Sequence, residues 1–263
     1  MMGLSIVLLA AGEGKRMKTD LPKPLLKLGD IPMVQHSLNT SMKLNPDRLI
    51  LVTGYKKDEV KKYVLAENSG DFIFCEQKER LGTGHAVKQA LPYLPENGKT
   101  LVLYADVPLV SLGTLRKLIR SCMRKKMSIL TADIDDPSGY GRIIRDKNDN
   151  PILIREQADA TKAEKSIKEI FSGIMVIENK HLKKGVNGLV RSNVKGEYYL
   201  TDLVEFSSRR KHSVGTVKTD VREVLGANNK EELTELYQSM TKLNLNDAAK
   251  KGVFFKDPSS CFI

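Results

Sequence analysis

Residues 4–25 read Leu-Ser-Ile-Val-Leu-Leu-Ala-Ala-Gly-Glu-Gly-Lys-Arg-Met-Lys-Thr-Asp-Leu-Pro-Lys-Pro-Leu. The stretch opens with a run from Leu4 to Ala11 that is apolar apart from one serine, too short to cross a membrane and typical of a strand buried on both faces. Glycines then end the run and let backbone N–H groups approach a ligand. Basic side chains surround the same turn, Arg16 and Lys23 among them. A buried strand, a glycine turn and positive charge together predict a phosphate site.

Two well-known glycine motifs are excluded by counting. A dinucleotide-binding fingerprint needs a third glycine three residues after the second, where this chain has Met17. A P-loop needs a glycine five residues before Gly14 and a Ser or Thr after the lysine, where the chain has Leu9 and Arg16. Neither an NAD site nor a Walker-type ATP site is therefore indicated. From glycines and charges alone, a strand followed by a solvated basic loop remains an alternative.

The complete sequence of residues 9–25 indicates which kind of phosphate site this is. Residues 9–17, Leu-Ala-Ala-Gly-Glu-Gly-Lys-Arg-Met, followed by Leu-Pro-Lys-Pro-Leu at 21–25, closely resemble the signature of the sugar-1-phosphate nucleotidyltransferases. The resemblance implies that the loop holds the nucleoside triphosphate, and that the catalytic residues Arg16 and Lys23 neutralise its phosphates. It also implies nucleotide contacts from four residues of the loop: Leu9, Ala10, Ala11 and Gly12.

Composition sets the class of protein but does not choose a ligand. The 263 residues are enough for one large α/β domain or two small ones, with 41% hydrophobic and 29% charged residues. The net charge of +11 suits nucleic acid, anionic membrane or small phosphorylated substrates. Three separated cysteines, Cys75, Cys122 and Cys261, favour a reduced cytoplasmic protein over a disulfide framework. Because no basic residue precedes the apolar run at residues 4–11, we expect a first strand there and no signal peptide or membrane association.

The first half of the chain alternates strands and helices. The hydrophobic pattern predicts strands at 4–11, 48–54, 72–76, 100–104 and 128–133, and helices at 33–43, 57–65 and 112–124. This order predicts an α/β, Rossmann-like fold: a mostly parallel sheet flanked by helices, with ligands beyond the carboxyl ends of the strands. Each of those ends is therefore a candidate binding position.

Two of the strand ends carry candidate motifs. Residues 77–86 form a glycine turn into a helix, which suits a base edge or an anion but is about equally typical of an N-capped helix. The family resemblance implies that Gln77, Gly82 and Thr83 contact uracil, while His85 is interpreted as structural.

The second motif is Tyr-Ala-Asp-Val-Pro-Leu at 104–109. An Asp at the tip of a buried strand suits Mg²⁺, although Asp is also common in caps and turns. The resemblance implies a magnesium site made by Asp106 and Asn228, with Tyr104 and Ala105 against the substrate. Ala105 stands where the family pattern has Gly. The neighbouring Asn229 is expected to cap the last helix, from 230 to about 243.

The pattern changes after residue 135. Short strands at 143–145, 152–156 and 170–176 come without full helices between them and predict a smaller mixed sheet over the nucleotide half. A helix at 197–210 and a strand at 213–219 follow. The chain here resembles the uridylyltransferase domain that makes UDP-N-acetylglucosamine, which implies sugar contacts from Gly141, Glu156 and Thr201. Phe171 departs from the family, which usually has an Asn that contacts the sugar.

These observations give a domain hypothesis. We expect a nucleotidyltransferase domain at 1–228, with a nucleotide half at about 1–135 and a sugar-binding half at about 136–228. Residues 229–263 are expected to be a C-terminal helix and a linker, because the tail resembles the point where two-domain relatives enter a β-helix acetyltransferase. Since that β-helix trimerises the relatives, their oligomeric state is not transferred to this chain.

The predicted reaction is Mg²⁺-dependent in-line transfer from UTP to N-acetylglucosamine-1-phosphate, giving UDP-N-acetylglucosamine and pyrophosphate. A phosphate with a second pKa near ~6 is already ionised at neutral pH, so no general base is required. The alternatives are a nucleotidyltransferase for another sugar phosphate or a cofactor such as molybdopterin, a regulatory homologue, and a basic nucleic-acid-binding protein. Nucleic acid is disfavoured because aromatic residues are only 6%, Trp is absent and the basic residues are spread along the chain.

Overall fold

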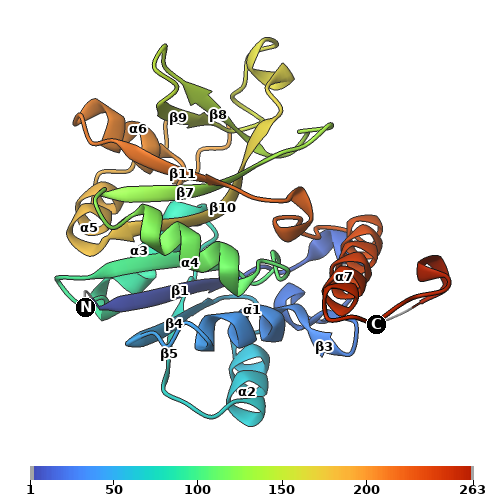
Figure 1. Cartoon of the computed structure of the whole chain (residues 1–263). Coiled ribbons are helices and arrows are strands. Elements are labelled where there is room, and N and C mark those ends of the chain that lie inside the picture. The colour runs from blue at the N-terminus through green and yellow to red at the C-terminus, as the bar shows by residue number, and fades with distance from the viewer. Residues whose placement is uncertain (1–2, 262–263) are drawn as a thin grey trace.

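The computed structural model describes residues 3–261, in which a central sheet lies between layers of helices (Figure 1). The strands are β1 (Leu4–Ala10), β2 (Lys27–Leu28), β3 (Ile31–Pro32), β4 (Arg48–Thr53), β5 (Phe72–Glu76), β6 (Lys99–Tyr104), β7 (Met127–Asp133), β8 (Gly141–Arg145), β9 (Pro151–Arg155), β10 (Glu169–Glu178) and β11 (Val214–Lys218). The α-helices are α1 (Met33–Met42), α2 (Lys57–Glu67), α3 (Thr83–Ala90), α4 (Leu112–Ser121), α5 (Asn179–Asn187), α6 (Asp202–Arg209) and α7 (Lys230–Lys250).

The sheet has the strand order β11-β7-β10-β6-β1-β4-β5. Strands β6, β1, β4 and β5 are parallel, and β11 is parallel to β7, so the predicted α/β fold with a mostly parallel sheet is confirmed. Helical crossover connections join the parallel strands, and they place the carboxyl ends of those strands along one edge of the sheet. That edge carries every sequence motif described above.

One strand prediction was wrong in its placement. The segment at 170–176 is part of β10, which runs antiparallel between β6 and β7 in the central sheet. The reason is burial: Ile170–Phe171 and Ile174–Ile177 of this ten-residue strand are all buried, which suits the middle of a sheet and not a half-exposed lid. Only its first residues also pair with β8, so the second layer is a β8–β9 hairpin attached to the end of β10.

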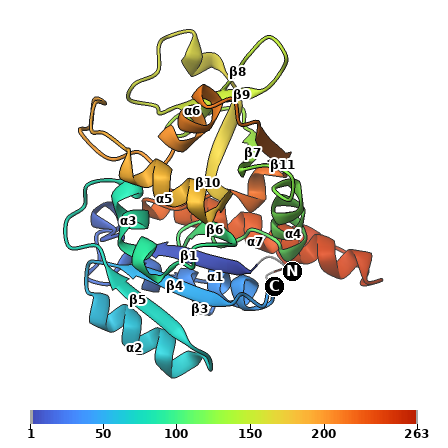
Figure 2. The same ribbon diagram turned by 90° about the vertical axis from the view of Figure 1, so that its left-hand side faces the viewer.

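Strand β1 shows why the sheet is covered on both faces. Val7 and Leu9 pack in the cluster that also contains residues of α3, α5 and α6. Ile6 and Leu8, which point the opposite way, pack with residues of α1, α2 and α4. A strand with apolar side chains on both sides needs a covering layer on each face, and Figure 2 shows helices on both sides of the sheet.

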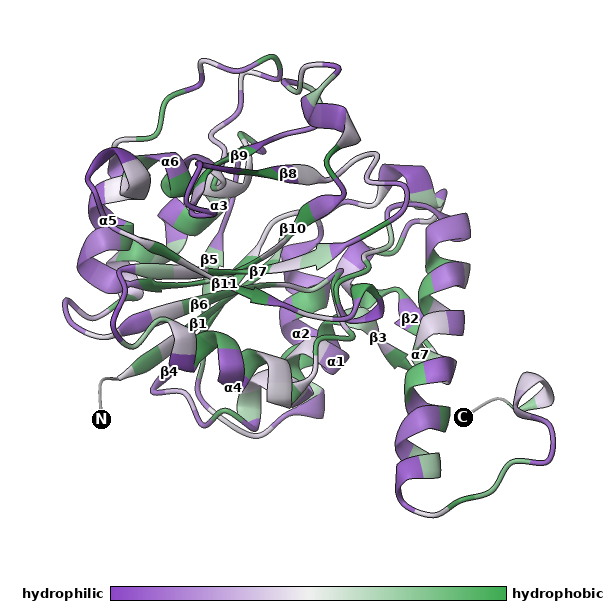
Figure 3. Ribbon diagram, turned by 45° about the horizontal axis from the view of Figure 1, so that its top comes forward, coloured by the Kyte–Doolittle hydropathy of each residue, from purple (hydrophilic) through white to green (hydrophobic). Residues whose placement is uncertain are grey.

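The last helix lies apart from these layers. Helix α7 buries Leu236 against Met17, Leu28 and Met33, next to the glycine loop and the β2–β3 hairpin. Figure 3 shows α7 as a mostly hydrophilic rod at one side of the apolar sheet. No helix within residues 3–261 is both long and apolar enough to cross a bilayer.

Several helix limits differ from the predictions. The helix predicted at 197–210 begins at Asp202, because residues 197–201 instead bind the turn before α3: the N–H of Tyr198 donates to the Leu81 carbonyl at 2.7 Å. Helix α4 ends at Ser121, short of residue 124, and α7 continues to Lys250, beyond the expected end near 243. The other predicted elements agree with the structure to within about two residues.

Candidate functional site

Two cavities meet at the carboxyl edge of the sheet, and together they contain every predicted site residue. The glycine-loop cleft, of about 280 Å³, lies beside β1, and the large cavity, of about 1010 Å³, extends from it toward the β8–β9 hairpin. The cleft is lined by Leu9, Ala10, Ala11, Gly12, Lys23, Gln77, Gly82, Thr83, Tyr104, Ala105 and Asp106. The large cavity shares Thr83, Tyr104 and Asp106 with it and adds Arg16, Gly141, Glu156, Thr201 and Asn228.

The glycine loop is folded around the stem of Lys23. Gly14 has a φ of 73°, and a Cβ there would lie 3.1 Å from the Cβ of Lys23. The backbone N–H of Lys23 donates to the Gly12 carbonyl at 3.3 Å. The lysine is only 8% exposed, so its ammonium has little freedom to leave the site. The glycines thus bring a buried cation to the end of β1.

The Lys23 ammonium holds two oxygens from distant parts of the chain. It donates to a carboxylate oxygen of Asp106 and, at 2.8 Å, to Oδ1 of Asn228. A carboxylate and an amide carbonyl are hard oxygen ligands, and here they already converge on one cation. The chemistry of these two residues therefore suits a divalent metal ion, which they would hold. Within residues 3–261, no three His, Cys, Asp or Glu side chains form a further metal cluster.

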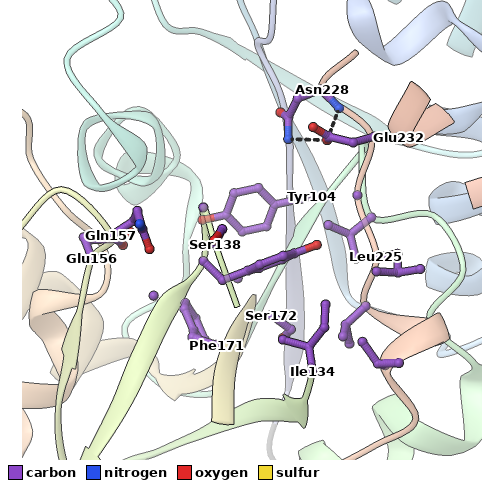
Figure 4. A pocket seen from close by; sticks show the side chains of 18 of the residues that line it. Tyr104, Ile134, Ser138, Glu156, Gln157, Phe171, Ser172, Leu225, Asn228 and Glu232 are labelled. Atoms are coloured by element: carbon purple, nitrogen blue, oxygen red, sulfur yellow. Dashed lines mark hydrogen bonds between the residues drawn. The ribbon is translucent and has the colours of Figure 1, made fainter. Parts of the chain in front are cut away.

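Glu232 orients Asn228 and was not predicted. One of its carboxylate oxygens accepts both the backbone N–H of Asn228, at 2.8 Å, and the side-chain N–H, at 3.0 Å (Figure 4). This fixes the amide so that Oδ1 faces Lys23. The sequence signal was available, because Asn229 and Glu232 have the spacing of a capping box. Asn229 caps α7 as predicted: its Oδ1 accepts the Glu232 N–H at 2.8 Å.

The turn before α3 is also built by close backbone contacts. Gly82 has a φ of 104°, and a Cβ there would lie 2.6 Å from the Tyr198 carbonyl oxygen. Gln77 donates from Nε2 to the Gly82 carbonyl at 3.1 Å, and Thr83 Oγ1 accepts the Leu200 N–H at 3.1 Å. His85 contacts the Gln77 and Gln89 side chains, in agreement with the structural role expected for it.

An ion pair joins this turn to the glycine loop and was missed in the sequence. Arg80 lines the glycine-loop cleft and pairs with Glu13. The two residues come from the loops after β5 and β1, so the pair fixes the distance across the cleft. Since nothing in either local motif marks Arg80 or Glu13 as partners, only the fold reveals the contact.

The far end of the large cavity is suited to hydroxyl groups. Thr201 donates to Glu156 at 2.9 Å, and burial raises the pKa of the Glu156 carboxyl. Burial, with the negative charge of Glu156 next, also raises the pKa of Tyr104. Gly141 lies beside them on β8, where a Cβ would lie 2.7 Å from Ile154. Figure 4 shows Glu156 and Gln157 at one end of the cavity and Asn228 with Glu232 at the other.

Phe171 lies in the wall between these ends. It is 6% exposed, pairs with Gly141 across β10 and β8, and lines the large cavity near Tyr104 (Figure 4). The ladder of β10 with β7 shifts register just after it, between Phe171 and Met175. The cavity wall at this position is therefore apolar. Ala105 requires no glycine, since its φ is not positive and its N–H donates to Leu9 at 3.0 Å.

The buried Lys23 ammonium is held by two oxygens at the junction of a cleft and a larger cavity suited to hydroxyl groups. This arrangement fits an enzyme that joins a nucleotide to a second substrate. Residues 6–170, more than half of the chain, match the family described as the MobA-like NTP transferase domain. The chain belongs to this family of nucleotidyltransferases.

Comparison with curated proteins gives nearer relatives. The chain is 44% identical over 257 residues to the bifunctional protein GlmU of Cupriavidus taiwanensis, and 38% identical over 259 residues to that of Idiomarina loihiensis. These matches cover 97% and 98% of this chain but 56% of each relative. The chain thus spans little more than half the length of the relatives that it matches.

Solved structures support the fold. A UDP-glucose pyrophosphorylase complexed with UDP-glucose has a TM-score of 0.74 at 17% identity, covering 92% of this chain and 99% of that one. The inositol-1-phosphate CTP transferase from T. maritima has a TM-score of 0.72 at 17% identity, covering 92% and 96%. Identities this low show a shared fold and no more.

Proposed function

We propose that this chain transfers a uridylyl group from UTP to N-acetylglucosamine-1-phosphate, forming UDP-N-acetylglucosamine and releasing pyrophosphate. The observation that carries the proposal is the meeting of Lys23, Asp106 and Asn228 at the junction of the two cavities. The identity of 38–44% to GlmU proteins over nearly the whole chain supports the same reaction. Since the chain covers only 56% of those relatives, no acetyltransferase activity is assigned to it.

In this proposal the cleft binds UTP and the large cavity binds the sugar phosphate. Gln77, Gly82 and Thr83 form the turn beside the uracil, and the glycine loop lies along the triphosphate. Gly141, Glu156 and Thr201 receive the sugar, because the hydrogen-bonded carboxyl of Glu156 offers an acceptor to hydroxyl groups. Arg16 lines the large cavity, as Asp106 does, and would face the phosphates.

The reaction needs positioning and charge neutralisation. The sugar phosphate attacks the α-phosphorus of UTP through an oxygen that is already ionised at neutral pH, and pyrophosphate leaves from the opposite side. Lys23 and Arg16 place positive charge where negative charge accumulates on the phosphates. Asp106 and Asn228 would hold Mg²⁺, which supplies further charge neutralisation at the phosphate oxygens. No side chain is required to act as a nucleophile or general base.

The cellular setting is also a proposal. The three cysteines are unpaired, and two of them, Cys75 and Cys122, are buried. This suits the reducing cytoplasm, where UTP and phosphorylated sugars are found. We propose that neither nucleic acid nor a membrane takes part in the reaction.

A second candidate differs only in the acceptor. Phe171 presents a ring to the large cavity where an amide is usual in the resembled family. An apolar wall offers no hydrogen-bond partner to the amide of an N-acetyl group, and an unpaired amide is costly to bury. A sugar-1-phosphate without that amide, such as glucose-1-phosphate, is therefore the alternative acceptor.

The test is pyrophosphate release with Mg²⁺. UTP, CTP and GTP are each offered with N-acetylglucosamine-1-phosphate and with glucose-1-phosphate. Turnover restricted to UTP and faster with the acetylated sugar supports the proposal. Turnover with UTP but a preference for glucose-1-phosphate supports the second candidate. A preference for CTP or GTP, or no release with any pair, contradicts both.

A further inference from the structure

A second polar cavity lies at the opposite end of the central sheet from the site described above. It has a volume of about 420 Å³ and is lined by residues 123–126, residues 211–213, Lys99 and Glu178. Lys99 begins β6, Glu178 ends β10, and the two segments precede β7 and β11, so the cavity lies at the amino edge of the parallel strands (Figure 1). Five steps along β6, about 3.3 Å each, separate Lys99 from Tyr104 by roughly 17 Å. This rear cavity is distinct from the catalytic one.

Positive charge dominates the rear cavity. Its basic residues are Lys99, Arg124, Lys125, Lys126 and Lys211, joined by His212. Its one carboxylate, Glu178, already accepts two hydrogen bonds from Lys126, at 2.7 and 2.9 Å. The two basic segments are far apart in the sequence and are brought together by the fold. Like charges gathered in this way repel one another unless an anion lies between them.

Lys99 makes the cavity more than a set of surface lysines. Lys99 is only 7% exposed, and its ammonium donates to the Cys122 carbonyl. Glu178 is its cross-strand neighbour, yet no ion pair joins Lys99 to any carboxylate within residues 3–261. An ammonium has three donors, and a nearly buried one without a counter-ion is uncommon. A bound anion would supply the missing partner.

The C-termini of two helices account for only part of this positive charge. Helices α4 and α6 both end here, and cations are favoured near the carbonyl groups of a helix C-terminus. Lys99 makes such a contact with Cys122, but the four other cations exceed what two helix ends require. A concave site lined by a nearly buried lysine also suits a compact ligand better than a flat bilayer or a nucleic-acid duplex. No aromatic ring lines it for stacking on bases, apart from His212.

We propose that the rear cavity is a second anion site, which binds a small molecule carrying two or more linked phosphate groups. One phosphate would reach Lys99, and the next would lie between the chain segments that carry Lys125 and Lys211. The proposal does not depend on the identity of the sugar or nucleotide bound at the other edge of the sheet.

Inorganic tripolyphosphate is the probe, and histidine ring resonances followed by NMR in the whole chain are the readout. His212 reports on the rear cavity, and His85, beside Gln77, reports on the glycine-loop cleft. Lys125→Gln combined with Lys211→Gln removes two cavity charges at exposed positions. Lys62→Gln combined with Lys117→Gln removes the same charge from exposed helix positions outside the cavity and is the matched control.

We expect tripolyphosphate to shift His212 in the unchanged protein and in the control at the same concentrations. The cavity variant should need at least about tenfold more, the loss expected when two charge-assisted contacts are removed. A shift of His85 alone, with His212 unmoved, overturns the proposal by placing the anion only in the catalytic cleft. Equal titrations for all three proteins overturn it too. Thermal melting of each variant confirms that it is folded.

Discussion

Lys23 has the central position among the charges of the site. It is nearly buried and donates to both Asp106 and Asn228, so its removal takes away the charge that these two side chains share. We expect Lys23→Ala to slow turnover at least about tenfold, a moderate loss for one removed electrostatic contact, and Arg16→Ala to do the same. Steady-state pyrophosphate release measures this. Lys27→Ala, exposed on β2, is the control, and near-normal rates for both test variants would contradict the mechanism.

If Asp106 holds a metal ion as proposed, the same lysine competes with that ion for it. Its ammonium occupies the point where the carboxylate and the Asn228 amide converge, so metal binding without nucleotide must displace it. We expect Lys23→Ala to bind Mn²⁺ at least about tenfold more tightly than the unchanged protein in the absence of UTP. The electron paramagnetic resonance signal of free Mn²⁺ measures the difference. Equal Mn²⁺ affinities of the two proteins would show that the lysine does not compete with the metal ion.

Asp106 is the carboxylate that Lys23 contacts, and replacing it should weaken metal binding. Asp106→Asn keeps the shape of the side chain but removes the charge that attracts a divalent cation. We expect a higher Mg²⁺ concentration for half-maximal rate and a lower maximal rate. A magnesium titration of turnover decides this, with Asp135→Asn, on the rim of the large cavity, as the control. An unchanged magnesium titration would show that residues other than Asp106 bind the metal.

We expect Phe171, in the wall of the large cavity, to influence the choice of sugar. Phe171→Asn places an amide in the cavity wall, and one added hydrogen bond of about 1 kcal/mol should lower the KM for N-acetylglucosamine-1-phosphate about fivefold. Removing a buried ring should also cost about 3 kcal/mol of unfolding free energy. Phe171→Leu is the control, since it removes the ring without adding an amide. No gain in KM from Phe171→Asn would mean that this residue does not face the sugar.

At the scale of single elements, the capping of α7 gives a clear prediction. Asn229 accepts the Glu232 N–H and donates to the Glu232 carboxylate at 2.7 Å, so Asn229→Ala removes both contacts. We expect a loss of about 1 kcal/mol in the free energy of unfolding, the usual value for an N-cap. Urea denaturation measures it. Thr234→Ala, exposed in the first turns of the same helix, should change stability much less, and equal losses would assign the effect to helix propensity.

The elements that could be predicted are those whose pattern is local. The run at residues 4–11, the glycine turns and the capping Asn229 each specify their structure within a few residues, and the structure agrees. Strand β10 could not be placed in the same way, because its position between β6 and β7 depends on pairing with segments 40 to 80 residues away. The start of α6 was missed for a similar reason. Its preceding residues bind the turn at Leu81, a contact invisible in the local sequence.

The residues of the candidate site also fall into two groups, those marked by a local motif and those that depend on distant contacts. Lys23 and Asp106 could be proposed because each lies in a motif at a strand end, and parallel strands bring their carboxyl ends together. Glu232 and Arg80 were missed because each acts through a partner on another segment. Glu232 orients Asn228 from the first turn of α7, and Arg80 reaches Glu13 across the cleft. Supporting contacts of this kind require the fold.

At the scale of the whole molecule, the part of the chain around the β8–β9 hairpin and α6 contains carboxyl groups whose charged form is disfavoured by burial. Burial, together with the negative charges of Glu205, Glu156 and Asp159, raises the pKa of Asp202 to about 6, although Arg155 opposes the shift in part. Burial also raises the pKa of Glu156. Carboxyl groups of this kind favour the protonated form in the folded chain. The folded state therefore binds more protons than the unfolded state between the two pKa values.

The sign of the pH effect follows from this difference. Asp202 costs no stability below pH 4, where it is protonated in both states, and its cost grows as the pH rises from about 4 to about 6, after which it is constant. One pKa unit corresponds to about 1.4 kcal/mol, and partial exposure to solvent reduces the cost of this shift to roughly 1–2 kcal/mol. We expect Asp202→Asn to melt at a higher temperature than the unchanged protein at pH 7 and at nearly the same temperature at pH 4. Thermal melting at both values measures the difference, with Asp220→Asn, whose pKa is lowered by Arg222, as a control of opposite sign. A constant difference between pH 4 and 7 would show that Asp202 is ionised alike in the folded and unfolded chain.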